Sequence, residues 1–237
     1  MTEISKIGQT PNVQKPEQQD SNGMLPKLPQ KGLEIREGMR VADVQANGTE
    51  AQKLIAAAFD EPTDVDSKGN LIGKDGVFDA KEAEFFNNYR FDLNKNKKEF
   101  TAYNTKTGCA VMIKYNSLEE LKDKNNMYML YRMIKDSRDF KGGGVVYDYR
   151  NNQVSLDGVS GSCFDIPSYP RHTTLKNCDL KLINATFCGE GCNLNIVNTK
   201  DVGMIWDSPV QVNVTNGQEP TINADSQSKI EIRRFEK

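Results

Sequence analysis

A short pattern repeats through the C-terminal part of the chain, and it constrains the fold more than any other sequence feature. From about residue 145, β-prone patches alternate with Asn, Asp and Gly, which favour turns. Apolar positions recur after 19, 19, 18 and 18 residues, at Leu156, Leu175, Leu194, Val212 and Ile230. A unit of this length cannot bury its own apolar face, so successive units must stack on one another.

This stretch resembles the single-chain parallel β-helices found in many bacterial surface and polysaccharide-acting proteins. The resemblance covers about 90 residues and rests on the period alone. It implies a short right-handed parallel β-solenoid over residues 142–237, with rungs stacked at about 4.8 Å. A β-sandwich with evenly spaced strands is the competing interpretation. The near-constant interval favours the solenoid.

Two helices are predicted to flank an acidic stretch in the N-terminal half. Thr49 suits the N-cap of the first helix, and Gln52 completes a capping box. The second helix is expected in DAKEAEFFNNY, anchored by Phe85 and Phe86. Between the two helices, residues 60–76 are rich in Asp and Gly, which makes this segment the candidate metal loop.

The helix–loop–helix resembles an EF-hand, most clearly in DGVFDAKE over residues 75–82. In that frame Asp75 matches the fifth position, Gly76 the invariant glycine and Phe78 the apolar eighth position. Asp79 then matches the ninth position and Glu82 the bidentate twelfth. The front of the frame departs from the family pattern, because its first and third positions carry no side-chain oxygen.

A second frame, DVDSKGNLIGKD, supplies the missing front, with Asp64 and Asp66 at the first and third positions. One loop lengthened by an insertion reconciles the two frames. The resemblance then implies a Ca²⁺ site formed by Asp64, Asp66, Asp75, Asp79 and Glu82. Asp60 is an alternative front ligand, and Asn70 is an additional oxygen donor. A degenerate metal-free EF-hand and an unrelated loop, in which Asp79 is only a helix N-cap, stay open.

The chain between the metal loop and the repeat predicts a small β-meander and one more helix. Strands are expected in YRFDL, KEFTAYN and CAVMIKYN. Ser117 and Glu120 then open a helix that should run to about Lys141, where three glycines follow. The expected fold class is therefore α+β: an EF-hand-like helix–loop–helix with a small β-meander and helix, followed by the solenoid. The expected division is 1–32 as a disordered tail, 33–141 as the first unit and 142–237 as the solenoid.

Composition argues against several classes of function. The net charge of −2 and the lack of a basic stripe argue against nucleic-acid binding, and no apolar run is long enough to span a membrane. The first residues lack the apolar segment of a secretory signal, so we expect a cytoplasmic protein, one exported without a Sec-type signal, or one whose signal has been removed. With His172 as the only histidine, a zinc site would need mostly thiolates, such as Cys188 and Cys192. Free thiols or one local disulfide are favoured.

We therefore expect a monomeric, calcium-binding, non-catalytic interaction or structural protein, whose solenoid presents a binding face for a glycan or protein ligand. The alternative is a small β-helix lyase or hydrolase acting on polysaccharide, which needs paired carboxylates. Carboxylates do occur in the repeat, but they form no catalytic motif with Arg171 or His172: Asp157, Asp165, Asp179, Asp201 and Asp207.

Overall fold

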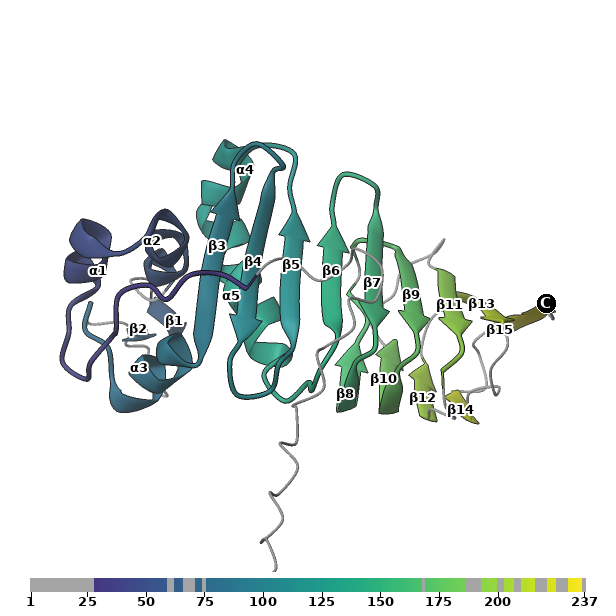
Figure 1. Cartoon of the computed structure of the whole chain (residues 1–237). Helices are drawn as coiled ribbons and strands as arrows, with labels where there is room; N and C mark the ends of the chain where they lie inside the picture. Colours follow the sequence, from purple (N-terminus) through teal and green to yellow (C-terminus); the bar gives the residue numbers. More distant parts are fainter. Residues whose placement is uncertain are drawn as a thin grey trace, which may run out of the picture.

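The computed structural model describes residues 28–58, 62–65, 71–73, 76–167, 169–185, 193–199, 203–206, 210–215, 221–224 and 230–235. Strands hold more of these residues than helices do, and the largest sheet is a mixed one of nine strands in the order β15-β13-β11-β9-β7-β6-β5-β4-β3 (Figure 1). A parallel sheet of four strands has the order β14-β12-β10-β8, and β1 pairs with β2. None of the described helices is long and apolar enough to span a bilayer.

Three short helices form the N-terminal end: α1 (Val41–Asn47), α2 (Glu50–Ala57) and α3 (Ala80–Asn87). The predicted capping box of α2 is confirmed, because the Thr49 side chain accepts a hydrogen bond from the Gln52 N–H and the Gln52 side chain returns to Thr49. Helix α3 begins after Asp79, as the sequence indicates. Helix α1 was not predicted.

The helix expected between Ser117 and about Lys141 is two helices, α4 (Leu118–Lys122) and α5 (Lys124–Asp136). Ser117 caps α4 as predicted. The break lies at Asp123, whose backbone has φ −59° and ψ 136° and whose side chain accepts a hydrogen bond from the Asn125 N–H. An Asp side chain that bonds the following backbone competes with helical continuation, so Asp123 ends α4 and caps α5.

The predicted meander is confirmed as β3 (Tyr89–Asn94), β4 (Glu99–Asn104) and β5 (Ala110–Lys114), which pair antiparallel. The sheet then continues through β6 (Gly144–Asp148) and β7 (Gln153–Asp157). The parallel strands that follow are β9 (His172–Lys176), β11 (Asn193–Val197), β13 (Val210–Thr215) and β15 (Ile230–Phe235). The four-stranded sheet consists of β8 (Ser160–Asp165), β10 (Asp179–Ala185), β12 (Gly203–Trp206) and β14 (Thr221–Ala224).

The predicted fold class, an EF-hand-like module with a small meander and helix followed by a right-handed parallel β-solenoid, is wrong. Strand β6 pairs in parallel with β5 and antiparallel with β7, so the meander and the C-terminal strands share one large mixed sheet. The glycines at the predicted boundary allow this pairing, because Gly143 has φ +56° and a Cβ there would lie 2.2 Å from the Asp157 carbonyl oxygen. The fold is an α+β arrangement dominated by strands.

The predicted boundary at residue 142 therefore lies between two neighbouring strands of one sheet. Whether 33–141 and 142–237 act as separate folding units stays a prediction. Residues 1–27 of the predicted tail, 1–32, lie outside the described residues. One hydrophobic core runs through the molecule, from Ile35 and Val44 near the helices to Leu175 and Ile196 in the C-terminal strands.

The register of the C-terminal strands differs from the predicted repeat. Leu156 pairs with Leu175 as expected, but Leu175 pairs with Ile196, which is 21 residues on, and not with Leu194. Equivalent turns follow β7, β9 and β11, where Gly158, Asn177 and Asn198 all have positive φ. Residues of this kind tolerate the left-handed conformation, so the turns repeat although their spacing varies.

Candidate functional site

The back half of the predicted calcium loop is a tight turn held by backbone hydrogen bonds. Gly76 has φ +72°, and its carbonyl oxygen accepts from the Val41 N–H at 2.7 Å. The Phe78 N–H donates to the Met39 carbonyl oxygen at 2.8 Å. Phe78 is fully buried, with its ring edge-on to that of Phe86 at 5.4 Å. The turn therefore has a fixed position relative to α1 and α3.

Two of the predicted calcium ligands, Asp79 and Glu82, meet at the start of α3. The Glu82 N–H donates to Asp79 Oδ1 at 2.7 Å, and the Asp79 N–H donates to Glu82 Oε2 at 3.1 Å. This is a capping box, and it places two carboxylates at a helix N-terminus, where the helix dipole favours negative charge. The N-cap role that the sequence left open for Asp79 is present, and it is compatible with a metal nearby.

The other predicted ligands come from the segment before Gly76. Asp64 lies in β1 (Pro62–Val65), where its backbone is opposite Ile72 of β2 (Leu71–Gly73). Asp66 and Asp75 lie outside the described residues, as do Asp60 and Asn70. A two-stranded hairpin, which the sequence did not predict, thus occupies part of the lengthened loop. In the part of the chain that the structure describes, no three His, Cys, Asp or Glu side chains gather closely enough to hold a metal.

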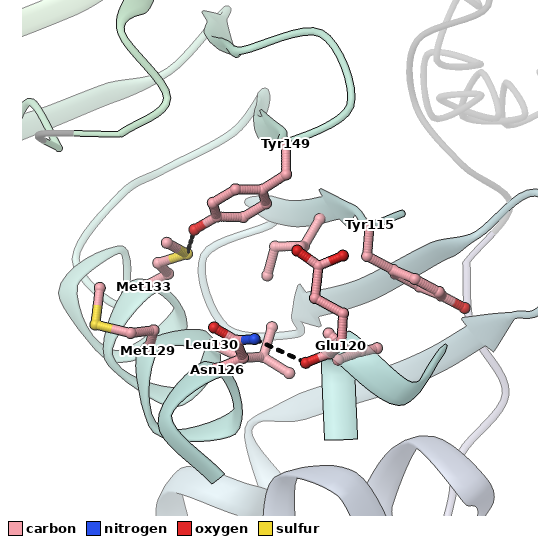
Figure 2. A pocket seen from close by; sticks show the side chains of 9 residues that line it. Tyr115, Glu120, Asn126, Met129, Leu130, Met133 and Tyr149 are labelled. Atoms are coloured by element: carbon pink, nitrogen blue, oxygen red, sulfur yellow. Dashed lines mark hydrogen bonds between the residues drawn. The ribbon is translucent and has the colours of Figure 1, made fainter. Parts of the chain in front are cut away.

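An apolar cavity lies between β5, α4 and α5 (Figure 2). Met129, Leu130 and Met133 line it on one side, and the Tyr149 hydroxyl points to Met133 Sδ at 3.5 Å. Burial, aided by the neighbouring Tyr169 and Glu120, raises the pKa of Tyr149 to about 12. The cavity volume is about 50 Å³, whereas a cavity that holds benzene measures about 150 Å³. We therefore regard it as a packing gap.

A larger and polar cleft, of about 550 Å³, lies where the segment after α5 meets the start of β8 and β10. Its walls combine three cations, two carboxylates and three hydroxyls, together with the backbone of Gly161: Arg138, Lys141, Lys181, Asp139, Asp179, Thr107, Ser160 and Ser162. These residues come from four separate segments, so no local motif in the sequence predicts the cleft.

The described cysteines do not offer an activated thiol. Burial raises the pKa of Cys109 to about 12, and burial also raises the pKa of Cys178. Desolvation and the nearby Asp165 carboxylate raise the pKa of the half-buried Cys163. Because a thiolate is the reactive form, all three are poor nucleophiles at neutral pH. Cys188 and Cys192 lie outside the described residues, so a zinc site or a local disulfide there stays untested.

Comparisons with known proteins identify no related site. No family model matches the chain, and neither a curated protein nor a solved structure is significantly similar to it. The EF-hand and β-helix resemblances thus have no support from a matching relative. What remains is the turn at Gly76 with its two carboxylates, and the polar cleft beside β8.

Proposed function

We propose that the protein is a calcium-binding, non-catalytic protein that engages a glycan or protein partner through the surface of its sheets. One observation carries the calcium part of the proposal. The left-handed turn at Gly76 buries Phe78 and delivers the carboxylates of Asp79 and Glu82 side by side at the first turn of α3. This is the arrangement that the back half of a calcium loop requires.

The composition of the loop supports the same proposal. The segment between α2 and Gly76 carries two lysines, Lys68 and Lys74, and five carboxylates. The carboxylates are those of Asp60, Glu61, Asp64, Asp66 and Asp75. So many negative charges in a short segment repel one another unless a cation lies among them. Ca²⁺ takes six to eight oxygen ligands, and carboxylates are its usual partners in proteins.

Glu82 would exchange one partner for another when calcium binds. Its Oε2 accepts the Asp79 N–H at 3.1 Å, and turning toward the loop gives up this bond, worth about 0.5–1.5 kcal/mol. A bidentate contact with a divalent cation offsets that cost. Gln is as good as Glu at this position of a capping box, so Glu82→Gln should keep the cap and remove only the charge.

A calorimetric titration with CaCl₂ tests the proposal on the full chain, on Glu82→Gln and on Glu84→Gln. Glu84 is the matched control, because it lies on α3 and pairs with Lys106 at 2.8 Å on the exposed surface. Solvent screens such a pair, so its loss should change stability little. We expect one site in the wild type, equal affinity in Glu84→Gln, and affinity at least about tenfold weaker in Glu82→Gln. Equal affinity in all three proteins would refute the assignment of Glu82.

The interaction role is supported by polar side chains that align across the parallel strands. Asn195 Nδ2 donates to Thr174 Oγ1 at 3.4 Å, and Asn213 Nδ2 donates to Asn195 Oδ1 at 2.8 Å. These three side chains occupy equivalent positions on β9, β11 and β13. Hydrogen bonds along the row fix the side-chain orientations, which lowers the entropic cost of binding a partner.

A further inference from the structure

We infer that the polar cleft beside β8 and β10 binds a carboxylate-bearing sugar, such as a short chain of uronic acid. The inference names a ligand class for the interaction role proposed above and rests on that role, but it does not depend on calcium. At about 550 Å³, the cleft lies within the usual range of ligand sites, roughly 300–1,000 Å³.

Two backbone hydrogen bonds and a close aromatic contact connect the segments that form the floor of the cleft. Lys141 and Ser160 exchange backbone hydrogen bonds at 2.9 and 3.1 Å, which ties the segment after α5 to the first residue of β8. The buried Phe140 ring lies directly against Gly161, where a Cβ would be 2.7 Å from Phe140 Cδ1. Glycine therefore allows the close approach of Phe140 at this point of the cleft lining, and the Phe140 ring also packs against Phe164, with ring centroids 6.2 Å apart.

The charge of the cleft is opposite to that of the whole chain. Arg138 Nε lies 3.6 Å from Asp139 Oδ2, so these two charges largely compensate each other. Lys141 and Lys181 are exposed, and neither forms an ion pair with any described residue. With the Asp179 carboxylate counted, the wall of the cleft still carries one net positive charge, in a chain whose net charge is −2. A cleft with such a local excess of positive charge attracts anions.

The remaining groups favour a hydroxylated anion whose charges are spread along a chain. Ser160 is directly opposite Asp179 in the pairing of β8 with β10, and Ser162 adds a second hydroxyl. Hydroxyls and carboxylates of this kind both bond sugar hydroxyl groups. The Asp179 carboxylate would oppose a compact, doubly charged phosphate more strongly than carboxylates spread along a uronic-acid chain. A uronic acid satisfies the lysines and the hydroxyls together.

Binding of trigalacturonate to the full chain tests this inference, with neutral galactotriose and inorganic phosphate as comparison ligands. The test variant is the Lys141→Gln/Lys181→Gln double substitution. The control is Lys97→Gln/Lys135→Gln, which removes two exposed charges that do not line the cleft. Calorimetry in 50 mM NaCl, with calcium and with EGTA, separates this site from the metal loop.

We expect trigalacturonate to bind equally well with calcium and with EGTA. Binding should weaken about tenfold or more in the Lys141→Gln/Lys181→Gln variant, and not in the control. Galactotriose should bind at least about tenfold more weakly than the acid, and added salt should reduce the difference. No binding of trigalacturonate at millimolar concentration, equal binding of the neutral sugar, unchanged affinity in the test variant, or tighter binding of phosphate would each overturn the inference. Calcium binding that persists beside any of these results would leave the metal proposal intact.

Discussion

The side-chain amide of Gln52 pairs with the backbone of Leu33 as a second peptide group would. The Leu33 N–H donates to Gln52 Oε1 at 2.9 Å, and Gln52 Nε2 donates to the Leu33 carbonyl oxygen at 2.7 Å. The side-chain amide of Asn87 pairs in the same way with the backbone of Ile35, two residues after Leu33, through hydrogen bonds of 2.9 and 2.7 Å. Two side-chain amides thus hold an extended segment against α2 and α3, the helices that flank the proposed calcium loop.

Replacing Gln52 should therefore destabilise the protein more than its position on a short helix suggests. The side chain is 5% exposed and also accepts the Thr49 N–H at 3.1 Å. Gln52→Ala leaves three backbone groups without this partner, and we expect a loss of about 2–3 kcal/mol in the free energy of unfolding. Urea denaturation measures the loss.

Gln45→Ala is the matched control, because Gln45 makes a single exposed bond to the Lys53 carbonyl oxygen. Its free energy of unfolding should change by no more than about 0.5 kcal/mol. Gln52→Glu should fall between the two variants, since Glu keeps the acceptor oxygen but cannot donate to the Leu33 carbonyl. Equal effects of the two alanine substitutions would contradict the stabilising role of the Gln52–Leu33 hydrogen bonds.

Asp148 should make the stability depend on pH at the acid end. Burial opposes ionisation of its carboxylate, but hydrogen bonds from Asn151 and Arg150 and the charges of Arg150 and Lys114 outweigh burial and hold its pKa below the ordinary value. A lowered pKa in the folded state stabilises the protein above the ordinary Asp value, and this contribution is lost as pH falls through the folded-state pKa. The free energy of unfolding should thus fall as the solution is acidified below about pH 4.

Urea unfolding at a series of pH values, compared between the wild type and Asp148→Asn, tests this dependence. At pH 7 we expect Asp148→Asn to cost about 1–3 kcal/mol, because the charge-assisted bonds are lost. Its acid slope should also be shallower than that of the wild type. The exposed Asp139→Asn serves as the control and should retain the wild-type slope. An unchanged slope in Asp148→Asn would show that another group causes the acid dependence.

The described cysteines should differ in their rate of alkylation. With a pKa of about 12, the buried Cys109 has a thiolate fraction at pH 8 roughly three orders of magnitude below that of an ordinary thiol. Iodoacetamide followed by peptide mass spectrometry should find Cys163 modified first, since it is only half-buried. Cys109 and Cys178 should react after unfolding in urea. Rapid labelling of Cys109 in the native protein would contradict its burial.

Local signals were the part of the fold that the sequence predicted well. The caps at Thr49 and Ser117 are confirmed, and the N-cap that was the alternative role of Asp79 is present. A side chain that bonds a backbone N–H three residues later is fixed by neighbours in the chain. The meander is confirmed for a similar reason, since consecutive strands joined by short turns pair with one another.

Non-local pairing was the part that the sequence could not predict. Strands β5 and β6 are neighbours in the sheet although α4 and α5 lie between them in the chain, and nothing in either strand specifies that pairing. The predicted register of β9 with β11 is wrong, because the repeat length predicted that Leu175 pairs with Leu194, whereas Leu175 pairs with Ile196. Both residues are apolar and two apart, so either satisfies the alternation of a strand.

The candidate site also has a local part that the sequence predicted and a non-local part that it did not. Asp79 and Glu82 are three residues apart and meet through a local cap. The front ligands depend on how a long segment returns to the turn at Gly76, and here β1 and β2 form a hairpin that the two overlapping frames did not predict. The polar cleft depends entirely on tertiary contacts, such as the bridge between Lys141 and Ser160.

Thermal unfolding with CaCl₂, MgCl₂ or EGTA tests the central claim of calcium binding most directly. A site filled at a hundred times its dissociation constant adds about 2.7 kcal/mol of stability, which for a chain of 237 residues corresponds to a rise in Tm of roughly 5–10 °C. We predict such a rise with calcium and a much smaller one with magnesium, and we predict that Glu82→Gln abolishes it while Glu84→Gln retains it. An unchanged Tm at millimolar calcium would contradict the account and leave the turn at Gly76 a metal-free connection between two helices.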